Sequence, residues 1–207
     1  MKKLEKEIRQ AITKLKIRAM EDEETEVVEG YALKFDRWSD NLGWFREKLA
    51  PNCLENTRMD NVVALFNHDQ SNILGRTGVN LDLSVDNIGL KFRLKPNHST
   101  TAKDLMENIR SGIVNQCSFA FTVPNEEGAE EWRYDKENDF YERTINKIDR
   151  LYDVSVVTTP AYPDTEVVVG ARGLEMVEDL KEAPKKQEAR RLLAELDKEI
   201  LLASLDD

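Results

Sequence analysis

The chain has 207 residues, of which 40% are hydrophobic and 34% are charged, and its formal net charge is −10 at pH 7. This length suits one soluble domain with appendages, and the negative charge argues against nucleic-acid binding, which requires a basic surface. No apolar run approaches the roughly 20 residues that cross a bilayer, and the basic N-terminus lacks the apolar core of a signal peptide, so we expect no membrane partner.

Cysteines and histidines are few. Cys53 and Cys117 are too few for a disulfide framework or a metal cluster, so a reducing cytoplasm is the simplest compartment. His68 and His98 are the only histidines, and they lack the spacing of a zinc motif. We expect neither a metal nor a cofactor.

The N-terminal third mixes helical and extended patterns. Residues 1–16 carry apolar side chains at helical spacing, which predicts a short amphipathic helix. The acidic segment 21–26 is expected to be a solvated turn or loop. Residues 27–35 have strand composition, and Gly30 indicates a bulge or a close backbone approach. Residues 36–54 are predicted as a loop with a short helical or extended piece.

The middle of the chain is rich in predicted strands. Residues 62–69 form an apolar run that ends in a polar triplet, and residues 79–96 are the clearest hairpin, with two alternating strands around the turn DNIG. Residues 100–113 predict a helix capped by Thr100 or Thr101, with Gly112 at its end. A strand at 114–123, an acidic surface hairpin at 124–142 and one or two strands at 143–163 follow.

The sequence changes character after Pro163. Residues 165–172 are strand-like, and the remainder is charged and helical in pattern, with one apolar stripe. The simplest interpretation is a solvated helix that docks weakly on the domain or on a twin helix; the alternative is a segment that addresses the protein to a partner. We therefore predict a charged lead-in at 1–26, a main domain at 27–172 and a helical tail at 173–207.

Ser118 is a candidate nucleophile. Strand alternation places Cys117, Phe119 and Phe121 on one face and Ser118 with Ala120 on the other. The small neighbour leaves room for a substrate backbone. The alternative is a small residue that faces solvent. A nucleophilic hydroxyl needs a base within hydrogen-bond reach, and the base needs a third group to orient it.

Candidates for the base and the acid are also few. His68 lies where an apolar strand ends and a loop begins, a position that suits a catalytic group. His98 precedes a predicted helix, and its position is more typical of a turn residue. Asp153 stands among valines, and a buried carboxylate is costly unless it is paired, for example with an imidazole. The alternative is an edge-strand carboxylate in water. Ser155 shares a strand face with Asp153, and it could be either a core hydroxyl or a hydrogen-bond donor to this acid.

These motifs also resemble a known family. The chain contains, in order, EGYALKFD, GWFREKLAPNCL, VVALFNHDQSNILGRT, LDLSVDNIGLKFRLKP, DLMENIRSGIVNQCSFAFTV and RTINKIDRLYDVSVVTTPAYPDTEV, over about residues 28–168. It thereby resembles the prohead, or capsid maturation, proteases of tailed bacteriophages, which are related to the herpesvirus assemblin proteases. The resemblance implies an α+β fold with a small β-barrel-like, mostly antiparallel core and flanking helices, and it makes 27–172 the protease domain.

The resemblance assigns roles to three residues. His68 falls on the family's general base, Ser118 on its nucleophile and Asp153 on its third member. Assemblins use a second histidine that follows the serine in the chain, and because His98 precedes Ser118, chain order speaks against it. Asp69 is a rival for the acid, although adjacent side chains rarely orient one another well.

The implied activity is that of a serine endopeptidase that forms and hydrolyses an acyl-enzyme. Arg76 and backbone N–H groups are candidates for binding the oxyanion. The resemblance also implies packaging inside the procapsid in the host cytoplasm, and cleavage of scaffold or major capsid protein N-terminal segments and of the chain itself. Assemblins act as dimers, so a homodimer is an open alternative. We expect the tail to be an addressing element that maturation removes.

Two other functions remain open. The chain could be a non-enzymatic internal scaffold whose helical ends bind capsid subunits, although a serine, a histidine and an acid in family positions favour an enzyme. It could also be a cysteine enzyme that uses Cys117. Alternation puts Cys117 and Ser118 on opposite faces, so at most one of them meets His68.

Overall fold

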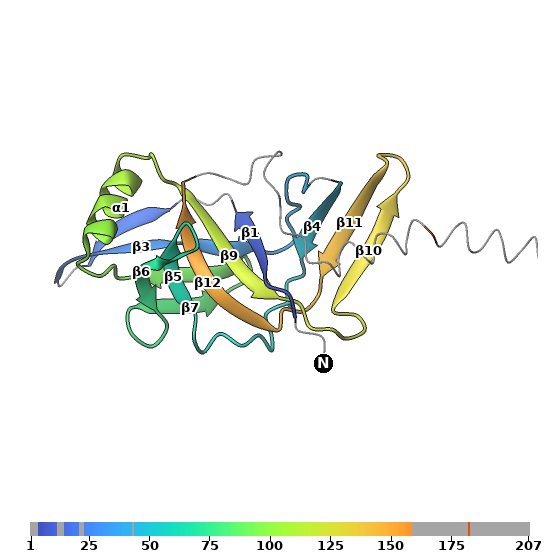
Figure 1. Ribbon diagram of the computed structural model, residues 1–207, viewed down its shortest axis with the longest axis horizontal. Coiled ribbons are helices and arrows are strands. Elements are labelled where there is room, and N and C mark those ends of the chain that lie inside the picture. The colour runs from blue at the N-terminus through green and yellow to red at the C-terminus, as the bar shows by residue number, and fades with distance from the viewer. Residues whose placement is uncertain (1–3, 12–14, 21–22, 43, 159–181, 183–207) are drawn as a thin grey trace, which may run out of the picture. The chain divides into compact units, whose positions relative to one another are not determined.

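Figure 1 shows the computed structural model of the chain, which describes residues 4–11, 15–20, 23–42, 44–158 and 182. The chain divides into two compact units, Met1–Val168 and Val169–Asp207. Apart from residue 182, the described residues all belong to the first unit, and the predicted helical tail lies outside them. The division into 1–26, 27–172 and 173–207 stays a prediction.

Within the described residues, the first unit has twelve strands and one helix. The elements are β1 (Glu7–Ala11), β2 (Lys16–Met20), β3 (Glu23–Lys34), β4 (Phe45–Leu49), β5 (Val63–Phe66), β6 (Asp69–Arg76), β7 (Leu81–Val85), β8 (Gly89–Leu94), α1 (Thr100–Arg110), β9 (Gln116–Thr122), β10 (Glu130–Asp135), β11 (Phe140–Ile145) and β12 (Arg150–Val157). They form sheets in the orders β1-β9-β12-β5-β6, β2-β3-β8-β7 and β10-β11-β4.

The expected fold class was wrong. We expected an α+β fold with a barrel-like core and flanking helices, but the described part of the chain is mostly β-structure with one short helix, and its three sheets do not close into a barrel. The five-stranded sheet ends in the edge strands β1 and β6. Its strands are also not all antiparallel, because β12 runs parallel to β5, as β11 does to β4.

The N-terminal helix was also wrong where the structure describes that segment. Glu7 and Arg9 are buried and Ile8 is half-buried, so alternate residues share a face, as in a strand. β1 pairs antiparallel with β9, with Glu7 opposite Phe121. The apolar spacing misled because the side chains that β1 buries most completely are charged. The acidic segment 21–26 likewise enters a strand, since β3 begins at Glu23.

Other elements follow the sequence closely. The hairpin at 79–96 is confirmed as the antiparallel pair β7 and β8, and the helix at 100–113 is confirmed as α1. Its cap is Ser99 rather than either threonine, since the Ser99 side chain accepts a hydrogen bond from the backbone N–H of Ala102. Gly112, at φ +77°, stands just past its end, as a left-handed C-terminal glycine does.

The buried face of β9 determines which way the side chains of its other face project. Cys117, Phe119 and Phe121 are buried in a hydrophobic cluster that also contains Phe92 of β8 and Leu151 of β12. Because side chains alternate along a strand, Ser118 must project from the opposite face of β9. The hydrophobic core thus decides the direction of the candidate nucleophile.

Gly89 provides a test of the close pairing between β8 and β3. It lies opposite Lys34, and a Cβ atom there would come within 2.1 Å of the Leu33 carbonyl oxygen. We expect Gly89→Ala to lower the free energy of unfolding by about 3 kcal/mol, measured by chemical denaturation. The control is Gly78→Ala, at φ +78° in open space, where only backbone strain of about 1 kcal/mol is expected. Equal losses would contradict the packing argument.

Candidate active site

His68 occupies a tight turn between β5 and β6. Phe66 and Asp69 pair across this hairpin, so only Asn67 and His68 form the loop. Their φ angles are 53° and 57°. Positive φ at both central positions is typical of the type I′ turn that joins strands through two residues, and asparagine and histidine are enriched in this region among non-glycine residues. The turn therefore holds the imidazole at a fixed point just beyond β5.

Asn67 ties this turn to the end of β12. Its backbone N–H donates to the carbonyl oxygen of Val156 at 3.0 Å, and its Oδ1 accepts from the backbone N–H of Thr158 at 3.0 Å. Since β12 runs parallel to β5, the turn after β5 lies beside the last residues of β12. His68 is thus positioned by two strands rather than by its own loop alone.

Pairing between β9 and β12 brings polar side chains together. Ser118 lies opposite Ser155, and Ala120 lies opposite Asp153. Directly opposite residues of paired strands project from the same face of the sheet. Ser118 of β9 and Ser155 and Asp153 of β12 therefore share the face of the sheet that points away from the hydrophobic cluster.

A β-bulge in β12 makes this arrangement possible. The register shifts between Leu151 and Asp153, so that Tyr152 is an extra residue. Strict alternation would put Leu151 and Asp153 on one face. With the bulge, Leu151 lies opposite Phe121 and joins the core, whereas Asp153 joins Ser118 on the other face.

The three residues that the sequence singled out form one hydrogen-bonded chain. His68 Nδ1 lies 2.6 Å from Asp153 Oδ1, and His68 Nε2 contacts Ser118 Oγ. An ionised carboxylate can only accept, so Nδ1 carries the hydrogen, and Nε2 of the neutral ring is left to accept from Ser118. Ser155 Oγ donates to Asp153 Oδ1 at 2.9 Å and lies 3.2 Å from Nδ1.

Burial and charge define the electrostatics of this chain. Asp153 and Ser118 are buried, and the His68 side chain keeps 15% exposure. Burial raises the pKa of Asp153, but the hydrogen bond and charge of His68, together with Lys6, outweigh it and hold that pKa below its ordinary value. Lys6 Nζ lies 2.9 Å from Asp153 Oδ2. The acid is therefore ionised at neutral pH.

This arrangement can activate a hydroxyl. The imidazole can take the hydroxyl proton while the carboxylate holds the opposite ring N–H and stabilises the cation that forms, which is the logic of nucleophilic acyl transfer.

Among the residues that the structure describes, no group of three or more His, Cys, Asp or Glu side chains could hold a metal ion. In the same part of the chain, no helix is long and apolar enough to cross a membrane.

Arg76 and His98 lie apart from this chain. Arg76 pairs with Val63, at the far end of the β5–β6 hairpin from His68, and its exposed guanidinium donates to the Asn61 side chain. This placement gives no support to its predicted oxyanion role, which stays a prediction. His98 is exposed in the segment that precedes α1.

Asp69 and Cys117 are engaged elsewhere. The Asp69 carboxylate accepts from the Ser71 backbone N–H at 2.8 Å and from Asn72 Nδ2 at 2.8 Å, both within the first half of β6. Cys117 is buried in the core, and burial raises the pKa of its thiol far above the ordinary value. Neither side chain is arranged as a partner of His68.

Sequence reasoning missed the contacts that β1 makes here. Lys6 reaches Asp153, and the carbonyl oxygen of Arg9 lies 2.9 Å from Ser118 Oγ, where it is an alternative to His68 Nε2 as acceptor of the single hydroxyl hydrogen. The only signal was the charge alternation around Ile8, which suits a strand edge as well as a solvated helix. Nothing in it indicated that β1 lies beside β9.

Asn67 offers a test of how the turn is held. We expect Asn67→Ala to lower the free energy of unfolding by about 1 to 2 kcal/mol, because alanine resists positive φ and leaves the Thr158 N–H without its acceptor. Asn67→Asp keeps both features and is the matched control. If denaturation curves place the two variants together, the side chain does not hold the turn.

Acid should weaken the contribution of Asp153 to stability. Its folded-state pKa is lowered, so the stabilisation is complete above the unfolded value of about 3.9 and is lost as the pH falls from there through the folded value. We expect the difference in unfolding free energy between wild type and Asp153→Asn to shrink between about pH 5 and about pH 3. A difference that stays constant over this range would argue against an ionised, paired carboxylate.

Comparisons with known proteins agree with this geometry. No curated protein sequence matches the chain. Its fold is similar to the bacteriophage T4 capsid assembly protease gp21, with a TM-score of 0.51 and 14% identity, covering 75% of this chain and 98% of that one. A model of the family described as caudovirus prohead serine protease matches residues 13–180. This match spans most of the chain and confirms the resemblance seen in the sequence motifs, so the chain belongs to the caudovirus prohead serine protease family.

Proposed function

We propose that this prohead protease is a serine endopeptidase in which Ser118 is the nucleophile, His68 the general base and Asp153 the residue that orients the base. The observation that carries the proposal is the buried hydrogen-bonded chain from Asp153 through His68 to Ser118. Membership in a family of serine proteases that act in capsid maturation supports the same interpretation.

The steps follow from the positions of the protons. Nε2 of His68 takes the proton of Ser118 as Oγ attacks a peptide carbonyl, and the positive ring is stabilised by Asp153. Nε2 then gives this proton to the departing amine, which leaves an ester on Oγ. A water molecule, deprotonated by the same nitrogen, hydrolyses the ester and regenerates Ser118. Ser155 holds Asp153 by donating to its Oδ1 throughout.

The proposed substrates are N-terminal segments of the scaffold or of the major capsid protein, and the chain itself, cleaved inside the procapsid in the host cytoplasm. Membership in the prohead protease family and the similarity in fold to the T4 capsid assembly protease support this proposal. A homodimer and removal of the tail at 173–207 stay predictions.

Two alternatives are less favoured. A non-enzymatic scaffold has no need for a hydroxyl, an imidazole and a carboxylate in hydrogen-bonded series, since burying such groups is costly unless they serve a purpose. A cysteine enzyme would need Cys117 as a thiolate near His68, whereas this thiol is buried in the core and its pKa is raised by burial.

The test is co-expression with the major capsid protein of the same phage, followed by intact mass measurements over time. Wild type is expected to trim the capsid protein or itself, and Ser118→Ala to lower the rate by about 1,000-fold or more, because it removes the attacking oxygen. Cys117→Ala, one residue away on the opposite face, is the matched control and should trim normally. Equal trimming by wild type and Ser118→Ala would reject the proposed nucleophile.

A further inference from the structure

The reactive face of β9, which carries Ser118, becomes accessible to solvent toward the start of that strand. Ser118 and Ala120 are fully buried, whereas Gln116, the first residue of β9, is half-buried. The neighbouring strand β12 shows the same gradient, because Ser155 is buried and Thr158, just past its end, is exposed. The solvent-facing end of the candidate site is therefore the end at which Gln116 lies.

Gln116 is the next side chain after Ser118 on this face. Side chains two residues apart on a strand project from the same face, and the rise per residue puts their Cα atoms about 7 Å apart. Gln116 lies opposite Val157, the last residue of β12. The turn that carries His68 is hydrogen-bonded to the same end of β12. Gln116 is thus a neighbour of the reacting groups on their accessible side.

The side-chain amide of Gln116 holds an unsatisfied acceptor. In the part of the chain that the structure describes, its Oε1 is buried and has no hydrogen-bond partner. A buried amide oxygen without a donor loses the hydrogen bonds that water would give it, and this loss lowers the stability of the fold. Native structures contain few such atoms, and a functional role is one reason for keeping one. A ligand that supplies the missing donor would satisfy Oε1.

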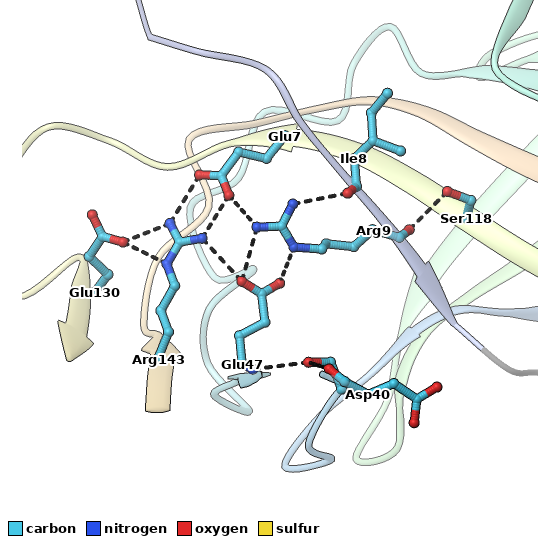
Figure 2. Close-up of polar contacts among 9 residues, drawn as sticks. Glu7, Ile8, Arg9, Asp40, Glu47, Ser118, Glu130 and Arg143 are labelled. Carbon is cyan, nitrogen blue, oxygen red and sulfur yellow. Dashed lines mark hydrogen bonds and ion pairs between the residues drawn. The ribbon is translucent and has the colours of Figure 1, made fainter. Parts of the chain in front are cut away.

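Buried charges near β9 are paired, in contrast to this amide. A cluster joins β1 to the three-stranded sheet, as Figure 2 shows, and its five members are the buried side chains of Glu7, Arg9, Glu47, Glu130 and Arg143. Glu7 accepts from Arg143 Nη1 at 2.6 Å, and Arg9 donates from Nε to Glu47 at 2.5 Å. Glu130 pairs with Arg143 at 2.6 Å. Burial in this part of the fold therefore does not by itself leave a polar side chain without a partner.

A peptide substrate carries the donor that Gln116 lacks. Every residue except proline has a main-chain N–H, which is a strong donor. In an extended peptide whose scissile carbonyl lies at Ser118 Oγ, main-chain N–H groups recur about every 3.4 Å along the chain. The residues next to the scissile bond therefore bring such groups within the distance that separates Ser118 from Gln116.

We propose that Gln116 is a substrate-binding residue, and that its Oε1 accepts a hydrogen bond from a main-chain N–H of the peptide beside the bond that Ser118 attacks. This inference rests on the proposed function. The hydrogen bond holds the scissile carbonyl next to Ser118 Oγ, and such positioning lowers the barrier to attack. Gln116 takes no part in the proton transfer between Ser118 and His68. Because the contact is made to the main chain, it fixes the position of the peptide without selecting a side chain.

The experiment compares a peptide substrate with a small probe in the full chain. Gln116→Met keeps the length of the side chain and removes its polar atoms. On co-expression with the major capsid protein, we expect trimming to slow on the order of 10-fold, because one hydrogen bond to the substrate is lost. A fluorophosphonate probe reacts with an activated serine and has no peptide N–H. Its labelling of Ser118, followed by intact mass, should stay within about twofold of wild type.

Two further variants and a stability measurement make the result specific. Gln70→Met makes the same substitution at an exposed glutamine of β6 and should trim like wild type. Gln116→Glu keeps an acceptor at the site and should recover trimming to within about threefold of wild type. Gln116→Met should unfold at the same denaturant concentration as wild type or at a higher one, because it removes an unsatisfied buried acceptor. A purely structural role predicts the opposite shift.

The failures are distinguishable. Normal trimming by Gln116→Met overturns the substrate contact while the protease function stands. Equal losses of trimming and labelling, or a lower unfolding midpoint, show that Gln116 supports Ser118 or the fold, and also overturn it. If Gln116→Glu trims as slowly as Gln116→Met, the acceptor role is wrong. If wild type is neither labelled nor trims the capsid protein, the proposed function fails, and this inference fails with it.

Discussion

The candidate site depends on the antiparallel pairing of β9 with β12. In this register Ser118 faces Ser155 across the ladder, while Val154 and Val156 face the core residues of β9. Because the side-chain period of a strand is two, a slip of one residue would send every polar group into the core and every apolar group out of it. The apolar residues on one face therefore enforce the position of the polar residues on the other.

The bulge at Tyr152 adjusts this register where a strict alternation would fail. Leu151 and Asp153 have opposite requirements, one for the core and one for the imidazole, yet they stand two residues apart. An inserted residue reverses the alternation between them, which is how bulges commonly redirect a side chain near a functional site. The carboxylate can then be buried because His68, Ser155 and Lys6 all contact it.

Contacts with the same face of the sheet also hold β1 in place. The strand contributes a carbonyl oxygen to Ser118, and two charged side chains to a buried cluster, while Lys6 just before it contributes a cation to Asp153. Burial raises the pKa of Glu7, but Arg143 and Arg9 outweigh it and keep that pKa below the ordinary value, so the carboxylate stays ionised within the cluster. The segment that the sequence marked as a charged lead-in is thus integrated with the reactive face of β9.

The sequence by itself determined the local elements with strong patterns and the identity of the reactive residues. The hairpin at 79–96, the helix at 100–113 and the two faces of β9 follow from alternation, helical spacing and turn residues. Motif resemblance singled out His68, Ser118 and Asp153, although their separation in the chain says nothing about distance. Only the tertiary structure decided the bulge at Tyr152, the open sheets in place of a barrel, and the strand conformation of residues 7–11. The physical reason is that these features arise from pairing between distant strands: a charged segment is extended and buried only when partners such as Arg143 and Glu47, far away in sequence, are brought to meet it.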